Sequence, residues 1–192
     1  MKRVLTLLFC CAIAGLAHSQ QMDQEAMMKA WQAYMTPGDV HKMLGKSDGK
    51  WTTETTMWMD PMAPPAKSKG TCVNKMTLGG RYQESDFHGS FMGQPFDGRG
   101  TLAYDNAKKV FINTWIDNMG TGIMVLQGPW DEASKSITFT GNVVDPSSGK
   151  DTPVREIFSI RDDNHHHMEM YMNGPDGKEM KTMEIDFTRA GK

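Results

Sequence analysis

Alternation of hydrophobic and polar residues with a period of two dominates the chain from Trp51 onward. In residues 51–59, Trp51, Thr53 and Thr55 share one face of an extended chain with two methionines. This period is typical of β-strands that turn one face towards a core. Further segments of this kind follow, and most are joined by links of hairpin size. They are residues 71–78, 81–87, 100–104, 110–117, 123–130, 136–144, 153–161, 166–173 and 178–189.

The residues before this region follow a helical period instead. Residues 22–35 predict an amphipathic helix, because their apolar side chains fall on one helical stripe and Thr36-Pro37-Gly38 follows as a stop signal. Asp39 is then expected to cap a second, short helical turn that ends at Gly45. Residues 60–65, with three prolines, and residues 89–98, with several glycines, are expected to form loops.

These patterns predict a mainly β protein. A meander of this size removes its exposed edges most simply by closing on itself, so we expect a single antiparallel, up-and-down β-barrel of about ten strands with an N-terminal amphipathic helix. In this organisation residues 1–19 are a signal peptide, residues 20–48 form a helical segment and residues 49–190 form the barrel domain.

The N-terminus has the pattern of a secretory signal. Lys2 and Arg3 precede an apolar run of about a dozen residues, and Ala17-His18-Ser19 offers small residues where signal peptidase cleaves. The run is shorter than the roughly 20 apolar residues that a membrane-spanning helix needs. We therefore expect an exported, periplasmic or secreted protein without membrane insertion after signal cleavage. A lipid anchor at Cys10 or Cys11 is the weaker alternative, because the residues before them do not fit a lipoprotein cleavage site.

The composition limits the partners of the mature chain. Loss of Lys2 and Arg3 takes the formal net charge from −2 to about −4, and no basic block remains. Nucleic acid and anionic membrane surfaces are therefore not expected partners. Cys72 is the single cysteine outside the signal, so the domain is expected to be held by its hydrophobic core rather than by an internal disulfide.

Several short motifs resemble those of known barrel families. Gly49-x-Trp51 and Arg189 resemble the calycin barrels, that is, the lipocalins and fatty-acid-binding proteins, and imply that Arg189 packs over Trp51 to close one end. A longer set over residues 38–190 is similar to the bacterial domain of unknown function family 1579. The set is His41-x-x-Leu44, Leu78-Gly79-Gly80-Arg81-Tyr82, Gly98-x-Gly100, Tyr104-Asp105, Trp115-Ile116-Asp117-Asn118-Met119-Gly120-Thr121 and Phe187-Thr188-Arg189. The resemblance implies an exported calycin-like, or lipocalin-like, barrel with no assigned activity.

A small-molecule cavity needs an apolar wall with a few oriented polar groups. Phe111, Trp115 and Asp117 share one face of a predicted strand, and either Arg81 or Arg155 is expected to pair with Asp117. Ordinary packing is the alternative role for each of these residues. The residues expected to bind a ligand are Trp58, Arg81, Phe111, Trp115, Asp117, Arg155 and Tyr171.

Methionine and histidine clusters give a second interpretation. Met57, Met59 and Met62 follow one another closely, and His165 and His167 would share one face of a strand. Thioethers are soft ligands that suit Cu(I), so these residues are candidates for a metal site. Methionine is also an adaptable filler of apolar walls, and a surface histidine tract is ordinarily solvated.

No pattern in the sequence supports catalysis. Ser90 beside His88 lacks the second glycine and the following helix of a nucleophile elbow, and Cys72 in a strand is most simply a small apolar residue. We expect a non-enzymatic, exported barrel that binds a small hydrophobic or amphipathic molecule in its interior without a cofactor. Copper handling, a filled structural barrel with a surface role, and haem held by His88 or His167 in a nitrobindin-like barrel are the alternatives.

Overall fold

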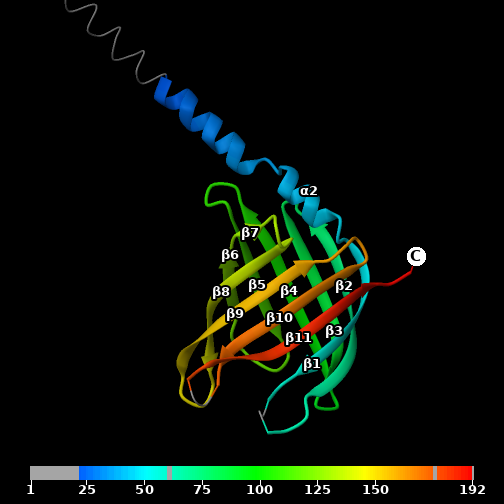
Figure 1. Ribbon diagram of the computed structural model, residues 1–192. Coiled ribbons are helices and arrows are strands. Elements are labelled where there is room, and N and C mark those ends of the chain that lie inside the picture. Colours follow the sequence, from blue (N-terminus) through cyan, green and yellow to red (C-terminus); the bar gives the residue numbers. More distant parts are fainter. Residues whose placement is uncertain (1–21, 60–61, 175–176, 192) are drawn as a thin grey trace, which may run out of the picture. The chain divides into compact units, whose positions relative to one another are not determined.

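The computed structural model describes residues 22–59, 62–174 and 177–191. Within these residues it has a helix over residues 22–35, a second helix and eleven strands (Figure 1). Their bounds are α2 Asp39–Gly45, β1 Gly49–Met57, β2 Ala66–Thr77, β3 Tyr82–Phe91, β4 Gln94–Asp105, β5 Val110–Asp117, β6 Met124–Gly128, β7 Trp130–Asp131, β8 Ser136–Asp145, β9 Lys150–Ile160, β10 His165–Asn173 and β11 Glu179–Arg189. The predicted signal and its cleavage site lie outside the described residues.

All the described strands belong to one antiparallel sheet that closes into a barrel (Figure 1). Strands that are consecutive in the sequence pair with one another, except β6 and β7, which both pair with β8. β11 pairs with β1, and the β6–β8 pairing completes the closure. β7 continues β6 in the same register on β8, and Pro129, which has no N–H group, interrupts the ladder between them. With β6 and β7 taken as one strand, the ten-stranded up-and-down barrel predicted from the sequence is confirmed.

The helix over residues 22–35 forms a unit of its own, which ends at Thr36. Thr36 Oγ1 donates a hydrogen bond to the backbone oxygen of Gln32 at 2.6 Å, so the last turn is closed by its own side chain. The predicted amphipathic helix is confirmed, and its apolar side chains are exposed: Met22, Met27, Met28, Trp31, Tyr34 and Met35. No helix among the described residues has both the length and the apolar character needed to cross a membrane.

The start of α2 is held by a histidine ring. The backbone N–H of Gly38 donates to His41 Nδ1 at 3.0 Å. Asp39 lies inside the first turn, where its carboxylate pairs with Lys42. The prediction that Asp39 caps this helix was therefore wrong by one position. Glycine at the cap has no side chain to accept a hydrogen bond from the first turn, and the His41 ring accepts the N–H of the cap residue itself.

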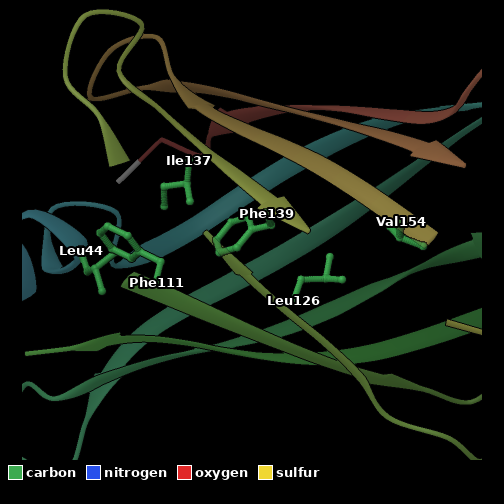
Figure 2. Close-up of a cluster of buried hydrophobic side chains, with 6 residues drawn as sticks. All are labelled: Leu44, Phe111, Leu126, Ile137, Phe139 and Val154. Atoms are coloured by element: carbon green, nitrogen blue, oxygen red, sulfur yellow. The ribbon is translucent and has the colours of Figure 1, made fainter. Parts of the chain in front are cut away.

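Alternate residues of each strand face the interior, and most of the buried apolar ones form two clusters. The first cluster is Leu44, Phe111, Leu126, Ile137, Phe139 and Val154 (Figure 2). Figure 2 shows these side chains, which come from α2 and from strands β5, β6, β8 and β9, gathered in the enclosed space. The second cluster is Trp51, Cys72 and Phe87, with Phe96, Trp115 and Phe187 packed around it.

The α2 end of the barrel is closed by an arginine over a tryptophan. The guanidinium carbon of Arg189 lies 4.3 Å from the centre of the Trp51 ring. The same guanidinium donates to the backbone oxygens of Lys46, Asp48 and Asp163. Trp51 itself is 1% exposed. Arg189 thereby ties the last strand to the segment before β1 and to the β9–β10 turn.

Residues 89–98 are mostly strand, which corrects the predicted loop. β3 continues to Phe91 and β4 begins at Gln94, so only Met92 and Gly93 form the turn, with φ values of 51° and 78°. Two residues with positive φ make a tight hairpin turn whose twist matches the strands. The prediction failed because the glycines in this segment are not all turn residues. Gly98 makes room inside the barrel for a tryptophan ring.

Candidate functional site

One row of side chains crosses the inner wall of the barrel from β8 to β1. Phe139 opposes Glu156, Glu156 opposes Met170, Met170 opposes Met183, and Met183 opposes Met57. Residues paired directly across antiparallel strands point to the same face. Phe139 and Glu156 are buried, which identifies that face as the interior. The row therefore places one carboxyl group between an aromatic ring and three thioethers.

Glu156 is hydrogen-bonded from the opposite side of the barrel. Asn113 Nδ2 on β5 donates to Glu156 Oε1 at 3.2 Å. Burial raises the pKa of Glu156 to about 7, although the hydrogen bond from Asn113 acts in the other direction. Near neutral pH this carboxyl group is therefore able either to accept or to donate a hydrogen bond in apolar surroundings.

Methionines form most of the wall next to Glu156. They are Met57, Met168, Met170, Met172, Met180 and Met183, on β1, β10 and β11. Met168 is buried, whereas the others keep partly accessible surface although they face inward. In a closed barrel an inward side chain with accessible surface borders a space that water can enter. Part of this methionine wall is therefore accessible to solvent, whereas Glu156 itself is buried.

Trp115 is a fixed part of the inner wall. A Cβ atom on Gly98 would lie 2.1 Å from Cζ2 of the Trp115 ring, so only glycine leaves room for this ring at that position. Phe96 stacks on the ring, and Trp115 Nε1 donates to Asp117 Oδ2 at 2.9 Å. The other carboxylate oxygen of Asp117 accepts the backbone N–H of Met119. Phe111, also on β5, is fully buried, so β5 supplies a rigid aromatic wall.

The structure does not bring the other predicted ligand residues into the interior. Arg155 and Tyr171 alternate with inward residues, and on the outer face the Arg155 guanidinium lies 4.0 Å from the centre of the Tyr171 ring. Arg155 pairs with Glu179 rather than with Asp117. Arg81 is exposed in the β2–β3 turn and donates to the backbone oxygen of Leu78. Trp58 follows β1, and the Lys181 ammonium lies 4.9 Å from its ring centre.

A separate cavity of about 270 Å³ lies at the α2 end of the barrel. Its lining includes His166 and Trp130. His166 is 4% exposed and stacks on Trp51 with ring centroids 4.4 Å apart. Burial lowers the pKa of His166 to about 4, and the nearby positive charge of Arg189 adds to this effect, so the imidazole is neutral at pH 7.

This cavity is somewhat small for a ligand pocket and has no dominant charge. Ligand pockets usually enclose roughly 300–1,000 Å³, and the α2-end cavity is smaller. Its charged lining residues balance, because Lys46 and Lys135 lie with Glu132 and Asp163. Nothing in that charge balance selects an anionic or a cationic ligand.

The residues predicted for the alternative metal site are spread over both sides of the barrel wall. Met57 faces the interior, whereas Met59 is 56% and Met62 is 93% exposed. His165 and His167 lie on the outer face, where they pair with Asp162 and Asp186. The structure therefore does not gather these five side chains at one point.

Cys72 has the properties of a small core residue. It is buried in the second cluster, and burial raises the pKa of its thiol to about 11. A thiol with so high a pKa is protonated at pH 7, and the protonated form is a poor nucleophile.

Comparisons with known proteins agree with this architecture. The model of the family described as protein of unknown function DUF1579 matches residues 36–189. The chain belongs to this family. The barrel of this DUF1579 protein is similar to Rv2717c from M. tuberculosis, with a TM-score of 0.62 and 12% identity over 81% of this chain and 100% of that one. It is also similar to the S-type phycobiliprotein lyase CPES from Guillardia theta, with a TM-score of 0.54 and 11% identity over 80% of this chain and 93% of that one.

No curated protein sequence matches this DUF1579 chain. At 11% and 12% identity the similarity to solved structures establishes a shared barrel fold. The chemistry of the interior depends on the residues of this chain.

Sequence reasoning missed the two buried titratable residues of the inner wall, Glu156 and His166. Glu156 sits between Arg155 and Ile157, and the sequence signal is only its place in the alternating run Val154, Glu156, Phe158. Its partner on β5 lies 43 positions away in the chain. The strand register needed to find this pair becomes available only in the folded barrel.

Proposed function

We propose that this protein binds a small amphipathic molecule inside its barrel. The polar group of the ligand would lie at Glu156 and Asn113, and its apolar part against the methionines of β1, β10 and β11. The observation that carries the proposal is the buried Glu156–Asn113 pair beside a wall of inward-facing methionines that is partly accessible to solvent.

A buried carboxyl group is an unfavourable choice for a barrel that needs only stability. Removing it from water costs free energy even with one hydrogen bond, and apolar residues of similar volume often give a more stable core. A carboxyl and an amide that converge in an apolar space do, however, provide the few oriented polar groups that a binding site needs. A ligand with a hydrogen-bond donor matches Glu156 when its carboxyl group is ionised.

The methionine wall fits a ligand of irregular shape. Unbranched thioether side chains adopt many rotamers and repack around different apolar surfaces at little cost. On the β5 side, Trp115 is fixed by Gly98 and Asp117 and supplies a flat, rigid surface. We therefore expect tolerance for the apolar part of the ligand and selectivity for its polar group.

We also propose that the protein is exported and acts by binding rather than by catalysis. The pattern of a charged start, an apolar run and Ala17-His18-Ser19 supports export. The protonated state of the Cys72 thiol supports a non-catalytic role. The similarity to the phycobiliprotein lyase concerns the fold, and a bilin is one of the amphipathic molecules to be tried as a ligand.

Fluorescence titration with N-phenyl-1-naphthylamine tests the proposed site, because this probe combines an apolar body with one N–H donor. We expect saturable, one-to-one enhancement of the probe fluorescence in the untagged protein. Glu156→Gln should weaken binding several-fold, and Met170→Trp should abolish it by filling the space. Glu169→Gln is the matched control, because Glu169 is next to Met170 in the chain but lies on the outer face of β10. This variant should bind the probe as tightly as the unmodified protein does.

Two results would contradict the proposal. One is a folded protein that does not enhance probe fluorescence, which would favour a filled structural barrel. The other is equal binding by Met170→Trp and the unmodified protein, which would place the probe outside the interior. Met183→Phe is a milder filling substitution if Met170→Trp does not fold. Native mass spectrometry of the protein purified from its own source would then identify the bound molecule.

A further inference from the structure

A compact set of metal-ligating side chains lies on the outer wall of the barrel, away from the proposed ligand space. His167 and Glu169 on β10 and Glu184 on β11 each offer one ligand atom, and these atoms all lie within 4.8 Å of one another. Glu169 and Glu184 are direct cross-strand partners. The three side chains are 14%, 26% and 24% exposed, so the set is partly shielded from water.

The His167 ring is oriented by a carboxylate on its far side. Asp186 Oδ1 lies 2.8 Å from His167 Nδ1, and Arg161 in turn pairs with Asp186 at 3.3 Å. With the proton on Nδ1, the lone pair of Nε2 faces Glu169, whose oxygen is 3.8 Å away. That distance is too long for a hydrogen bond. Metal-binding histidines commonly have this arrangement, in which a carboxylate fixes the ring and the other nitrogen is left for the ion.

A positive charge already lies among these acceptors. The Lys181 ammonium is 3.2 Å from Glu169 and 2.6 Å from Glu184, and it sits over the Trp58 ring. The two carboxylates therefore stabilise a cation at this place.

We propose that His167, Glu169 and Glu184 bind a divalent transition-metal ion of the zinc type, which displaces the Lys181 ammonium. One imidazole nitrogen and two carboxylate oxygens are ligands that suit zinc, at about 2.0–2.2 Å from the ion. The two glutamate side chains have to rotate to bring the three donor atoms, which lie within 4.8 Å of one another, around one ion. Lys181 is 31% exposed, so its displaced ammonium has access to solvent.

The choice of ion follows from the donors. Calcium and magnesium prefer oxygen ligands alone, and Cu(I) prefers thioethers and thiolates, none of which belongs to this set. The site is independent of the proposed interior ligand, because its residues point to the other side of the barrel wall. It also shares only His167 with the five residues that the sequence pattern nominated for copper.

Competition with a chromophoric zinc chelator tests the proposal in the untagged, full barrel. We expect one zinc ion per chain, and at least about a 10-fold loss of affinity in His167→Gln and in Glu184→Gln. Lys181→Met should tighten zinc binding by a similar factor, because it removes the competing charge and keeps the apolar stem. Asp186→Asn should weaken binding by about 10-fold without removing a direct ligand.

His165→Gln is the matched control, since His165 lies two positions away on the same face and pairs with Asp162 instead. It should leave zinc affinity unchanged. Equal losses in His165→Gln and His167→Gln with none in Glu184→Gln would overturn the proposal and show binding by the exposed histidine tract. Absence of zinc binding by the folded protein would overturn it as well. Circular dichroism of each variant distinguishes loss of the site from loss of the fold.

Discussion

The two faces of β10 carry similar residues in opposite surroundings. His166 on the inner face is buried against Trp51 and Phe158. His167, the next residue, lies on the outer face and pairs with Asp186. One step along the strand thus separates the inner wall of the barrel from the proposed metal site. The position of a residue in the two-residue period, more than its type, decides which chemistry it takes part in.

Truncating one side chain on each face should give the largest difference. Met168 is 8% exposed, and Met168→Ala should lower the free energy of unfolding by about 2–4 kcal/mol, because a cavity replaces buried surface. Glu169→Ala should lower it by less than about 1 kcal/mol, because the pair with Lys181 is partly solvated. Urea unfolding of both variants measures the difference. Similar losses in the two would show that the inner face of β10 is not packed as described.

The two buried titratable groups of the inner wall should respond to pH with opposite signs. His166 has a pKa of about 4 in the folded protein and a usual value of 6.5. The unfolded chain therefore binds the proton first, and acidification from pH 7 to pH 5 destabilises the fold by about 2 kcal/mol through this group. Glu156 has a pKa of about 7 against a usual value of 4.5. Here the folded protein binds the proton first, and the same acidification stabilises it by about 2 kcal/mol.

Single substitutions separate these two contributions. His166→Gln removes the destabilising protonation of His166. On acidification from pH 7 to pH 5, the free energy of unfolding of this variant should therefore rise relative to that of the unmodified protein. Glu156→Gln removes the stabilising protonation of Glu156. Over the same pH interval, the free energy of unfolding of that variant should therefore fall relative to that of the unmodified protein. Unfolding free energies at pH 5, 6 and 7 give the slopes. Parallel slopes in all three proteins would mean that neither group titrates as its burial requires.

A smaller effect should distinguish the two faces of β1. Thr53 Oγ1 is buried and has no hydrogen-bond partner among the described residues. Thr53→Val should therefore raise the free energy of unfolding by about 1 kcal/mol, because it removes an unsatisfied polar atom without changing the volume much. Thr52 is exposed and donates weakly to the backbone oxygen of Thr188, so Thr52→Val should be nearly neutral. Loss of stability in Thr53→Val would reveal a partner for its hydroxyl, such as a bound molecule.

The strand pattern of the sequence was sufficient for the fold and insufficient for the site. Periodicity, turn residues and the Gly49-x-Trp51 motif identified the barrel, because these are local signals. Which face of each strand points into the barrel depends on pairing with strands that are distant in the sequence. In β10, His166 and His167 are the same residue type, and the sequence alone does not say which one the barrel encloses. Arg155 and Tyr171 were expected inside for the same reason, and the register places them outside.

Two glycines in the sequence indicate which face of β4 points into the barrel. Gly98 and Gly100 were treated first as turn or motif residues, whereas they lie beneath the Trp115 ring. A glycine at every second position opposite an aromatic residue on a neighbouring strand is a packing signal as well as a flexibility signal. Two-residue spacing in Gly98-x-Gly100 puts both glycines on one face, and that face is the interior.

The pairing of β1 with β11 has a consequence for how the protein is made. Trp51 opposes Arg189, so the first strand of the barrel has to wait for the last one before its second edge is satisfied. Contacts between such distant positions form slowly and late, because a long loop must close first. Until β11 is available, β1 presents an open edge, whereas β2 is already paired with β1 and β3. The C-terminal strand therefore sets the moment at which a newly made chain becomes safe from aggregation.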